Sequence, residues 1–134
     1  MKTNLYNEYL NLPRSLAIET MKGMHEQLVE EVGEDVDAIE LYKDFADSAT
    51  KYAAVRASWM TLSSKEKMDQ DKLRTSYHNS LIVRINVLAR HLRTKGKAVE
   101  WRNLLGDEEE DNFCRKTIGD FGCYVVFVHS LMAR

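Results

Sequence analysis

The chain has 134 residues, of which 44% are hydrophobic and 30% charged, and it carries a net charge of −2. A chain of this length can bury a core without disulfides or bound metal, and a single proline with six glycines leaves few of the turns that a β-sandwich needs. The small net charge gives no reason to expect binding to nucleic acid or to an anionic membrane as the default.

No apolar run of signal-peptide length follows Met1, and no stretch approaches the ~20 apolar residues of a membrane span. We therefore expect one helical domain over residues 1–134, in the cytoplasm and without membrane contact. Cys114 and Cys123 lie nine positions apart, which places them on opposite faces of a helix, so we expect reduced thiols rather than a disulfide. No zinc or redox motif surrounds them, and no cofactor is expected.

Apolar residues recur every three or four positions in the first half of the chain. Pro13 suits the first turn of a helix that would end near Gly33. Its apolar stripe consists of Ala17, Met21, Met24 and Leu28. Asp35 is a suitable cap for a second helix. The apolar line of that helix consists of Ala38, Leu41, Phe45, Ala49 and Tyr52.

Ser63 and Glu66 have the spacing of a capping box, which predicts the start of a third helix. This helix is polar in its first turns, which we expect to overhang the core or to fray. Its apolar stripe then consists of Tyr77, Leu81, Ile85, Leu88 and Leu92. Gly96 is a suitable left-handed residue to end it. A short helical piece over residues 98–105, anchored by Trp101, would follow.

The final segment, from Asp107 to Arg134, has acidic residues at its start, where the helix macrodipole favours negative charge. Apolar residues surround its middle, which predicts a helix that is buried on more than one side. Residues 124–128 have a strand-like composition, but no second β-rich run could pair with them, so a helix is favoured. The predicted fold is all-α: a four- or five-helix up-and-down bundle with a short helical piece before the last helix.

Asp120, Phe121 and Gly122 spell the magnesium-binding tripeptide of protein kinases. The chain lacks the glycine-rich loop, the paired lysine and the catalytic loop that give this tripeptide its meaning. We therefore interpret it as a polar residue and a close helix contact beside a core phenylalanine. No nucleophile motif is present either, and an enzyme is the less favoured interpretation.

Three histidines lie at the edges of the apolar stripes of three different helices. They are His25, His78 and His129. Because packed helix axes lie only ~8–10 Å apart, their imidazoles could converge on one metal ion. Histidines at such edges are also common without any metal, so a metal-dependent enzyme is only an alternative hypothesis.

The end of the third helix is basic. A possible nucleic-acid-binding face consists of Arg84, Arg90, Arg93, Lys95 and Lys97. Cations are also favoured at a helix C-terminus for electrostatic reasons, and no aromatic residues alternate with these cations to stack on bases. Nucleic acid is therefore the second hypothesis for the partner.

The favoured function is a non-enzymatic protein–protein interaction or self-associating module. Its interface would use apolar surface of the last helix, at Tyr124, Phe127 and Leu131, together with aromatic residues elsewhere. The additional aromatic residues are Tyr6, Tyr9, Trp59 and Trp101. The partner would be a second copy of the chain or another protein.

Overall fold

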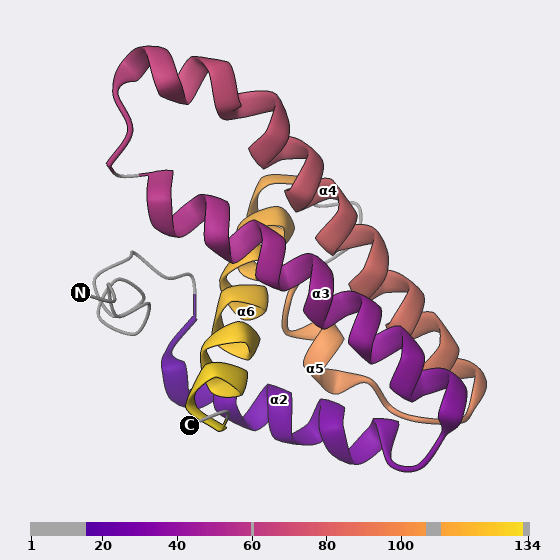
Figure 1. Cartoon of the computed structure of the whole chain (residues 1–134). Coiled ribbons are helices and arrows are strands. Elements are labelled where there is room, and N and C mark those ends of the chain that lie inside the picture. Colours follow the sequence, from indigo (N-terminus) through magenta and orange to yellow (C-terminus); the bar gives the residue numbers. More distant parts are fainter. Residues whose placement is uncertain (1–15, 60, 107–110, 133–134) are drawn as a thin grey trace.

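In a computed structural model, the described residues are 16–59, 61–106 and 111–132, and within the last range the side chains of 114–130 are described. They form helices and connecting turns, as the sequence predicts (Figure 1). The helices are α2 (Ile18–Val32), α3 (Val36–Trp59), α4 (Ser64–Thr94), α5 (Glu100–Asn103) and α6 (Asp111–Met132). The predicted all-α bundle, with a short helical piece before the last helix, is confirmed.

Polar side chains and glycines define the ends of these helices. Ser63 accepts a hydrogen bond from the Glu66 amide at 3.2 Å, and Glu66 accepts one from the Ser63 amide at 3.0 Å, which completes the predicted capping box. Asp35 accepts bonds from the first amides of α3. Gly96, just after α4, adopts a φ of 78°, the left-handed conformation expected there.

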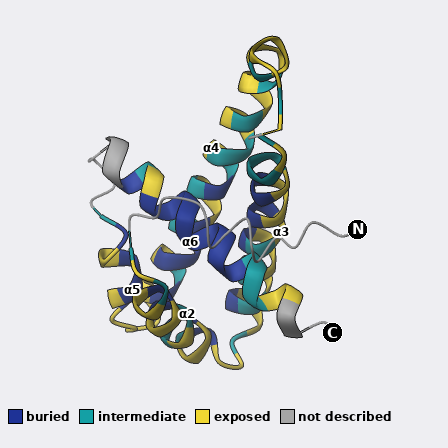
Figure 2. Ribbon diagram, turned by 90° about the vertical axis from the view of Figure 1, so that its left-hand side faces the viewer, coloured by how far each residue is buried: buried dark blue, intermediate teal, exposed yellow. Residues whose placement is uncertain are grey.

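Helices α3 and α4 form a long antiparallel hairpin, and α6 packs against both of them (Figure 1). One end of the hairpin projects beyond the rest of the molecule, and Figure 2 shows this end largely exposed. Met68 is 79% exposed there, and Leu73 is also exposed. The predicted overhang of the third helix is therefore confirmed.

The middle of α6 is the centre of the core (Figure 2). All nine residues from 117 to 125 are buried, so the middle of this helix is buried on more than one side, as the sequence predicted. Gly122 permits close packing, because a Cβ atom at this position would lie 2.9 Å from Leu81 Cδ2 and 3.5 Å from Ala49 Cβ. Cys114 and Cys123 are both buried and are not bonded to each other.

Helix α2 is fixed to α5 by side chains that bond to the later segment. Glu31 accepts hydrogen bonds from the Trp101 indole at 2.7 Å and from the Val99 amide at 3.1 Å. Gln27 accepts a bond from the Trp101 amide at 2.8 Å. Trp101 itself is fully buried, so the predicted anchor of this short helix is confirmed.

Two boundaries differ from the prediction or lie outside the described residues. The first described helix begins at Ile18, and Pro13 lies outside the described residues. The last helix begins at Asp111, and the acidic residues 107–110 that precede it also lie outside them. Among the helices that the structure describes, we find none with an apolar stretch long enough to cross a bilayer.

Candidate anion-binding pocket

A hollow of about 440 Å³ opens between α3, α4 and α6, and most of the side chains around it are cationic. Its lining residues are Tyr52, Arg56, Arg74, Thr75, His78, Arg115 and Lys116. Each of the three helices contributes at least one arginine or lysine. The pocket is therefore suited to an anion.

Arg56 lies at the inner wall of the pocket and forms an ion pair with Asp120. The Arg56 Nη1 atom lies 2.7 Å from Asp120 Oδ1, and the two side chains are 19% and 1% exposed. The same nitrogen lies 3.9 Å from the Cys123 sulfur. A buried carboxylate needs such a partner, since an unpaired charge in the core is costly. Asp120 thus holds the guanidinium at the pocket wall.

The Arg74 side chain is held by one residue of α3 and one of its own helix, α4. Its guanidinium stacks over the Trp59 ring at 4.3 Å from the centroid, and its Nη2 lies 3.3 Å from Asp71 Oδ1. The Nε atom of Arg74 is buried and has no hydrogen-bond acceptor among the described residues. Buried N–H groups in proteins usually donate a hydrogen bond. A bound ligand could supply the acceptor for Arg74 Nε.

Arg115 and His78 form the wall that connects α6 to α4. Arg115 donates to Asn79 Oδ1 at 2.7 Å, and its carbonyl accepts a bond from His78 Nε2 at 2.7 Å. The His78 ring stacks on Tyr52 with centroids 4.7 Å apart. Burial lowers the pKa of His78 from its usual value, so the imidazole is neutral at pH 7.

Gly119 lacks a side chain, and this allows α6 to lie close to the stacked rings of Tyr52 and His78. A Cβ atom there would lie 3.1 Å from the Tyr52 hydroxyl and 3.3 Å from His78 Nε2. This contact adds to the predicted one at Gly122, beside the core residue Phe121. Its purpose is structural: it brings α6 against the two rings and so sets the position of Arg115.

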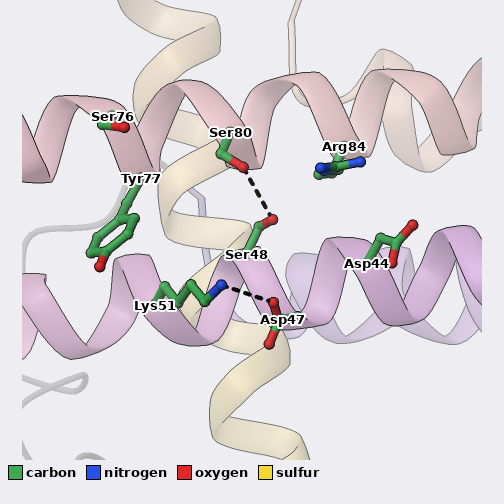
Figure 3. Close-up of a pocket in the computed structure, with 8 residues that line it drawn as sticks. All are labelled: Asp44, Asp47, Ser48, Lys51, Ser76, Tyr77, Ser80 and Arg84. Atoms are coloured by element: carbon green, nitrogen blue, oxygen red, sulfur yellow. Dashed lines mark hydrogen bonds and ion pairs between the residues drawn. The ribbon is translucent and has the colours of Figure 1, made fainter.

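A second, smaller hollow of about 260 Å³ lies between α3 and α4 (Figure 3). Ser48 and Ser80 point toward each other across it and lie 3.3 Å apart. Asp44, Asp47, Lys51 and Arg84 lie along the same groove, so its charges are balanced. This groove has no surplus of positive charge to attract an anion.

The three predicted metal ligands do not meet. His25 and His129 both contact the Tyr42 hydroxyl, at 2.7 and 2.8 Å from their Nε2 atoms. His78 instead contacts Tyr52 and the Arg115 carbonyl. Within the described ranges, no group of three histidine, cysteine or acidic residues could hold a metal ion. The structure thus brings two of the three histidines together around a phenol.

The Tyr42 hydroxyl connects its own helix, α3, to α2 and α6. Burial raises the pKa of Tyr42 to about 12, so it keeps its proton near neutral pH. Because a phenol carries one hydrogen, it donates to one imidazole and accepts from the other. The cluster of His25, Tyr42 and His129 therefore acts as a hydrogen-bonded connection between α2, α3 and α6.

The five predicted nucleic-acid-binding residues are all exposed, but they do not form one site with the cationic pocket. These residues are Arg84, Arg90, Arg93, Lys95 and Lys97. Arg84 lines the α3–α4 groove. Arg102, close to them in sequence, is 1% exposed and donates to Asn86 and to the Gly106 carbonyl. Arg102 and Asn86 thus face inward.

The predicted interface is only partly at the surface. Tyr124 is 5% exposed and packs in the chain's own core, with its ring against His25, so it does not offer a face to a partner. Trp101 is likewise buried within the chain. Phe127 is half-buried. The side chain of Leu131, and Tyr6 and Tyr9, lie outside the described residues.

Sequence reasoning did not identify the cationic pocket. Its charged members lie at positions 56, 74, 115 and 116, and no local motif relates them. Asp120 gave a signal, since it is an acidic residue within an otherwise apolar stretch of helix and implies a buried cation as partner. That partner, Arg56, lies 64 positions earlier and could not be identified from periodicity.

Comparison of the chain with known protein families, with characterised proteins and with solved structures finds no match.

Proposed function

We propose that this protein is a non-enzymatic interaction module, and that it binds an anionic segment of a partner protein in the pocket between α3, α4 and α6. The observation that supports this proposal is the set of three guanidinium groups, from Arg56, Arg74 and Arg115, placed on three helices around one hollow. Each is held by a group of the protein itself, so little conformational entropy is lost on binding.

A binding role agrees better than a catalytic one with the chemistry of the pocket wall. The nearest thiol, Cys123, is buried, and burial raises its pKa to about 11, so it stays protonated and is a poor nucleophile. The neighbouring side chains donate hydrogen bonds and carry positive charge. Such groups hold an anion and leave it unchanged.

The hairpin end supplies apolar surface next to the pocket. Met68 is exposed, and it lies on the same face of α4 as Thr75, a pocket residue seven positions later. An acidic peptide with a nearby apolar residue would contact both kinds of surface. The proposal includes the cytoplasmic location expected from the sequence.

The experiment is a titration with a fluorescein-labelled acidic peptide, followed by anisotropy at low ionic strength. We expect binding that weakens by about tenfold in the variant Arg115→Gln, since loss of one charge-assisted hydrogen bond is worth about 1.5–3 kcal/mol. The control is Arg84→Gln, which removes an arginine of the same helix pair from the other groove. Absence of binding by acidic and phosphorylated peptides alike would end the proposal.

Nucleic acid is the second candidate partner, because the five basic residues at the end of α4 and just after it are all exposed. In that case a single-stranded oligonucleotide would bind with an affinity that falls steeply as the salt concentration rises. Arg90→Gln and Arg93→Gln would weaken oligonucleotide binding, and Arg115→Gln would leave it unchanged. The two sets of variants thus separate the two candidates.

A further inference from the structure

We infer that the anion that the cationic pocket binds is a phosphate monoester carried on a side chain of the partner. This inference rests on the proposed function and specifies the chemical group that is recognised. Its grounds are the charge surplus of the pocket, its free hydrogen-bond donors and its size.

The charge surplus corresponds to a dianion. Among the residues whose side chains the structure describes, four cations line the pocket: Arg56, Arg74, Arg115 and Lys116. Two of them contact carboxylates, those of Asp120 and Asp71, and this leaves a surplus of two positive charges. A phosphate monoester carries about −1.5 to −2 charges at pH 7, whereas a carboxylate or a phosphodiester carries one. Only the monoester balances the surplus as a single group.

The anchoring of the arginines leaves several N–H donors free for a phosphate. Arg56 and Arg74 contact their carboxylates through one terminal nitrogen each, Nη1 and Nη2 respectively. Arg115 contacts Asn79 through its Nη2. A guanidinium has five N–H donors in a planar fork that suits phosphate oxygens. The buried Arg74 Nε, which has no acceptor in the described part of the chain, is one such donor.

The size of the hollow indicates an esterified phosphate rather than the free ion. At about 440 Å³ the pocket lies in the range of sites that hold a small organic ligand, roughly 300–1,000 Å³. A phosphate ion alone would leave most of that space empty. The Tyr52 ring, stacked on His78, supplies an apolar surface for the side chain that carries the phosphate.

The test uses three peptides of one sequence, alanine-rich and soluble, with phosphoserine, glutamate or serine at the central position. We expect the phosphoserine peptide to bind at least about tenfold more tightly than the glutamate peptide, because it offers one more charge and one more oxygen to the arginines. The affinity of the phosphoserine peptide, relative to that of the glutamate peptide, should also fall between pH 7.5 and 5.5, because the phosphate dianion takes up one proton near pH 6. Protonation of His78 in the pocket wall would act on both peptides, so the ratio of their affinities reports the phosphate alone.

Two variants and two further probes complete the experiment. Arg74→Gln and Arg115→Gln should each weaken phosphopeptide binding about tenfold, with circular dichroism confirming the fold, while Arg84→Gln should leave it unchanged. Equal binding of glutamate and phosphoserine peptides would overturn the phosphate inference and leave the proposed function standing. Inorganic phosphate binding as tightly as the phosphopeptide, or an oligonucleotide binding more tightly, would also overturn it. Failure of every peptide to bind would remove both.

Discussion

Asp120 and Arg56 form an ion pair of 2.7 Å between α6 and α3, at the point where the core meets the cationic pocket. Asp120 is almost completely buried, whereas Arg56 retains some contact with solvent. The pair therefore has two roles: it neutralises a carboxylate inside the bundle, and it fixes the direction of the guanidinium that faces the pocket.

Removal of Arg56 should destabilise the fold strongly. Arg56→Met leaves the Asp120 carboxylate buried without its ion-pair partner, and we expect the free energy of unfolding to fall by about 3–5 kcal/mol. The double variant Arg56→Met with Asp120→Leu should recover most of this loss. Urea unfolding followed by circular dichroism measures both. Lys51→Met, which breaks the exposed pair with Asp47, is the control and should change stability by less than about 0.5 kcal/mol.

Acid should weaken the connection of α2 to α3 and α6. Burial, and secondly the charge of His129, lowers the pKa of His25 below its usual 6.5. The unfolded chain then binds a proton more readily than the folded one, so the contribution of His25 to stability is present above pH ~6.5 and is lost as the pH falls below it. Unfolding midpoints at pH 7.5 and 5.5 should show this loss, and His25→Gln should reduce it. A titration of the His25 ring by nuclear magnetic resonance with a pKa at or above 6.5 would contradict the prediction.

Substitution of helical glycines by alanine should stabilise the protein at one position and destabilise it at two others. Gly23 has open space where a Cβ would lie, so Gly23→Ala should stabilise the protein by about 0.5–1 kcal/mol through helix propensity. At Gly122 the same atom would lie 2.9 Å from buried Leu81, and at Gly119 it would press on Tyr52. Gly119→Ala and Gly122→Ala should therefore cost about 1–3 kcal/mol. Thermal unfolding of the three variants tests the difference in sign.

Val99 is a β-branched residue with a φ of 46°, in the left-handed region, and its side chain is buried. Such a conformation costs about 1–3 kcal/mol in a residue with a Cβ atom. Val99→Gly removes this strain together with the apolar contacts, so we expect a change within about 1 kcal/mol. Val99→Ala loses contacts and keeps strain, and it should be the less stable variant. The reverse order in chemical unfolding would show that the backbone at this position is not strained.

Much of the fold could be predicted from the sequence because the information is local. The capping box at Ser63, the glycine at position 96 and the apolar waist of the last helix depend on residues within a few positions of one another. The start of the first described helix, at Ile18, was less well predicted, since helix ends without a strong cap carry a weak local signal.

The candidate site could not be predicted in the same way. Its arginines are placed by the packing of three helices, and sequence periodicity does not specify which residues of different helices face one another. For Tyr124, the sequence could not indicate whether the ring is buried in the chain's own core or exposed to a partner. Its burial against His25 depends on how α2 crosses α6. Similarly, the edge positions of His25, His78 and His129 were apparent, but not which of them would meet.

The hydrogen bond from the Trp101 indole to Glu31 spans 70 positions of the chain. At a synthesis rate of roughly 5–20 residues per second, this separation corresponds to about 4–14 s. During that time α2 has already left the ribosome's active centre, and the apolar side chains of Met21, Met24 and Leu28 have no α5 to cover them. A nascent chain that stalls before Trp101 would therefore lack the tryptophan whose amide and indole bond to Gln27 and Glu31 of α2 in the folded protein.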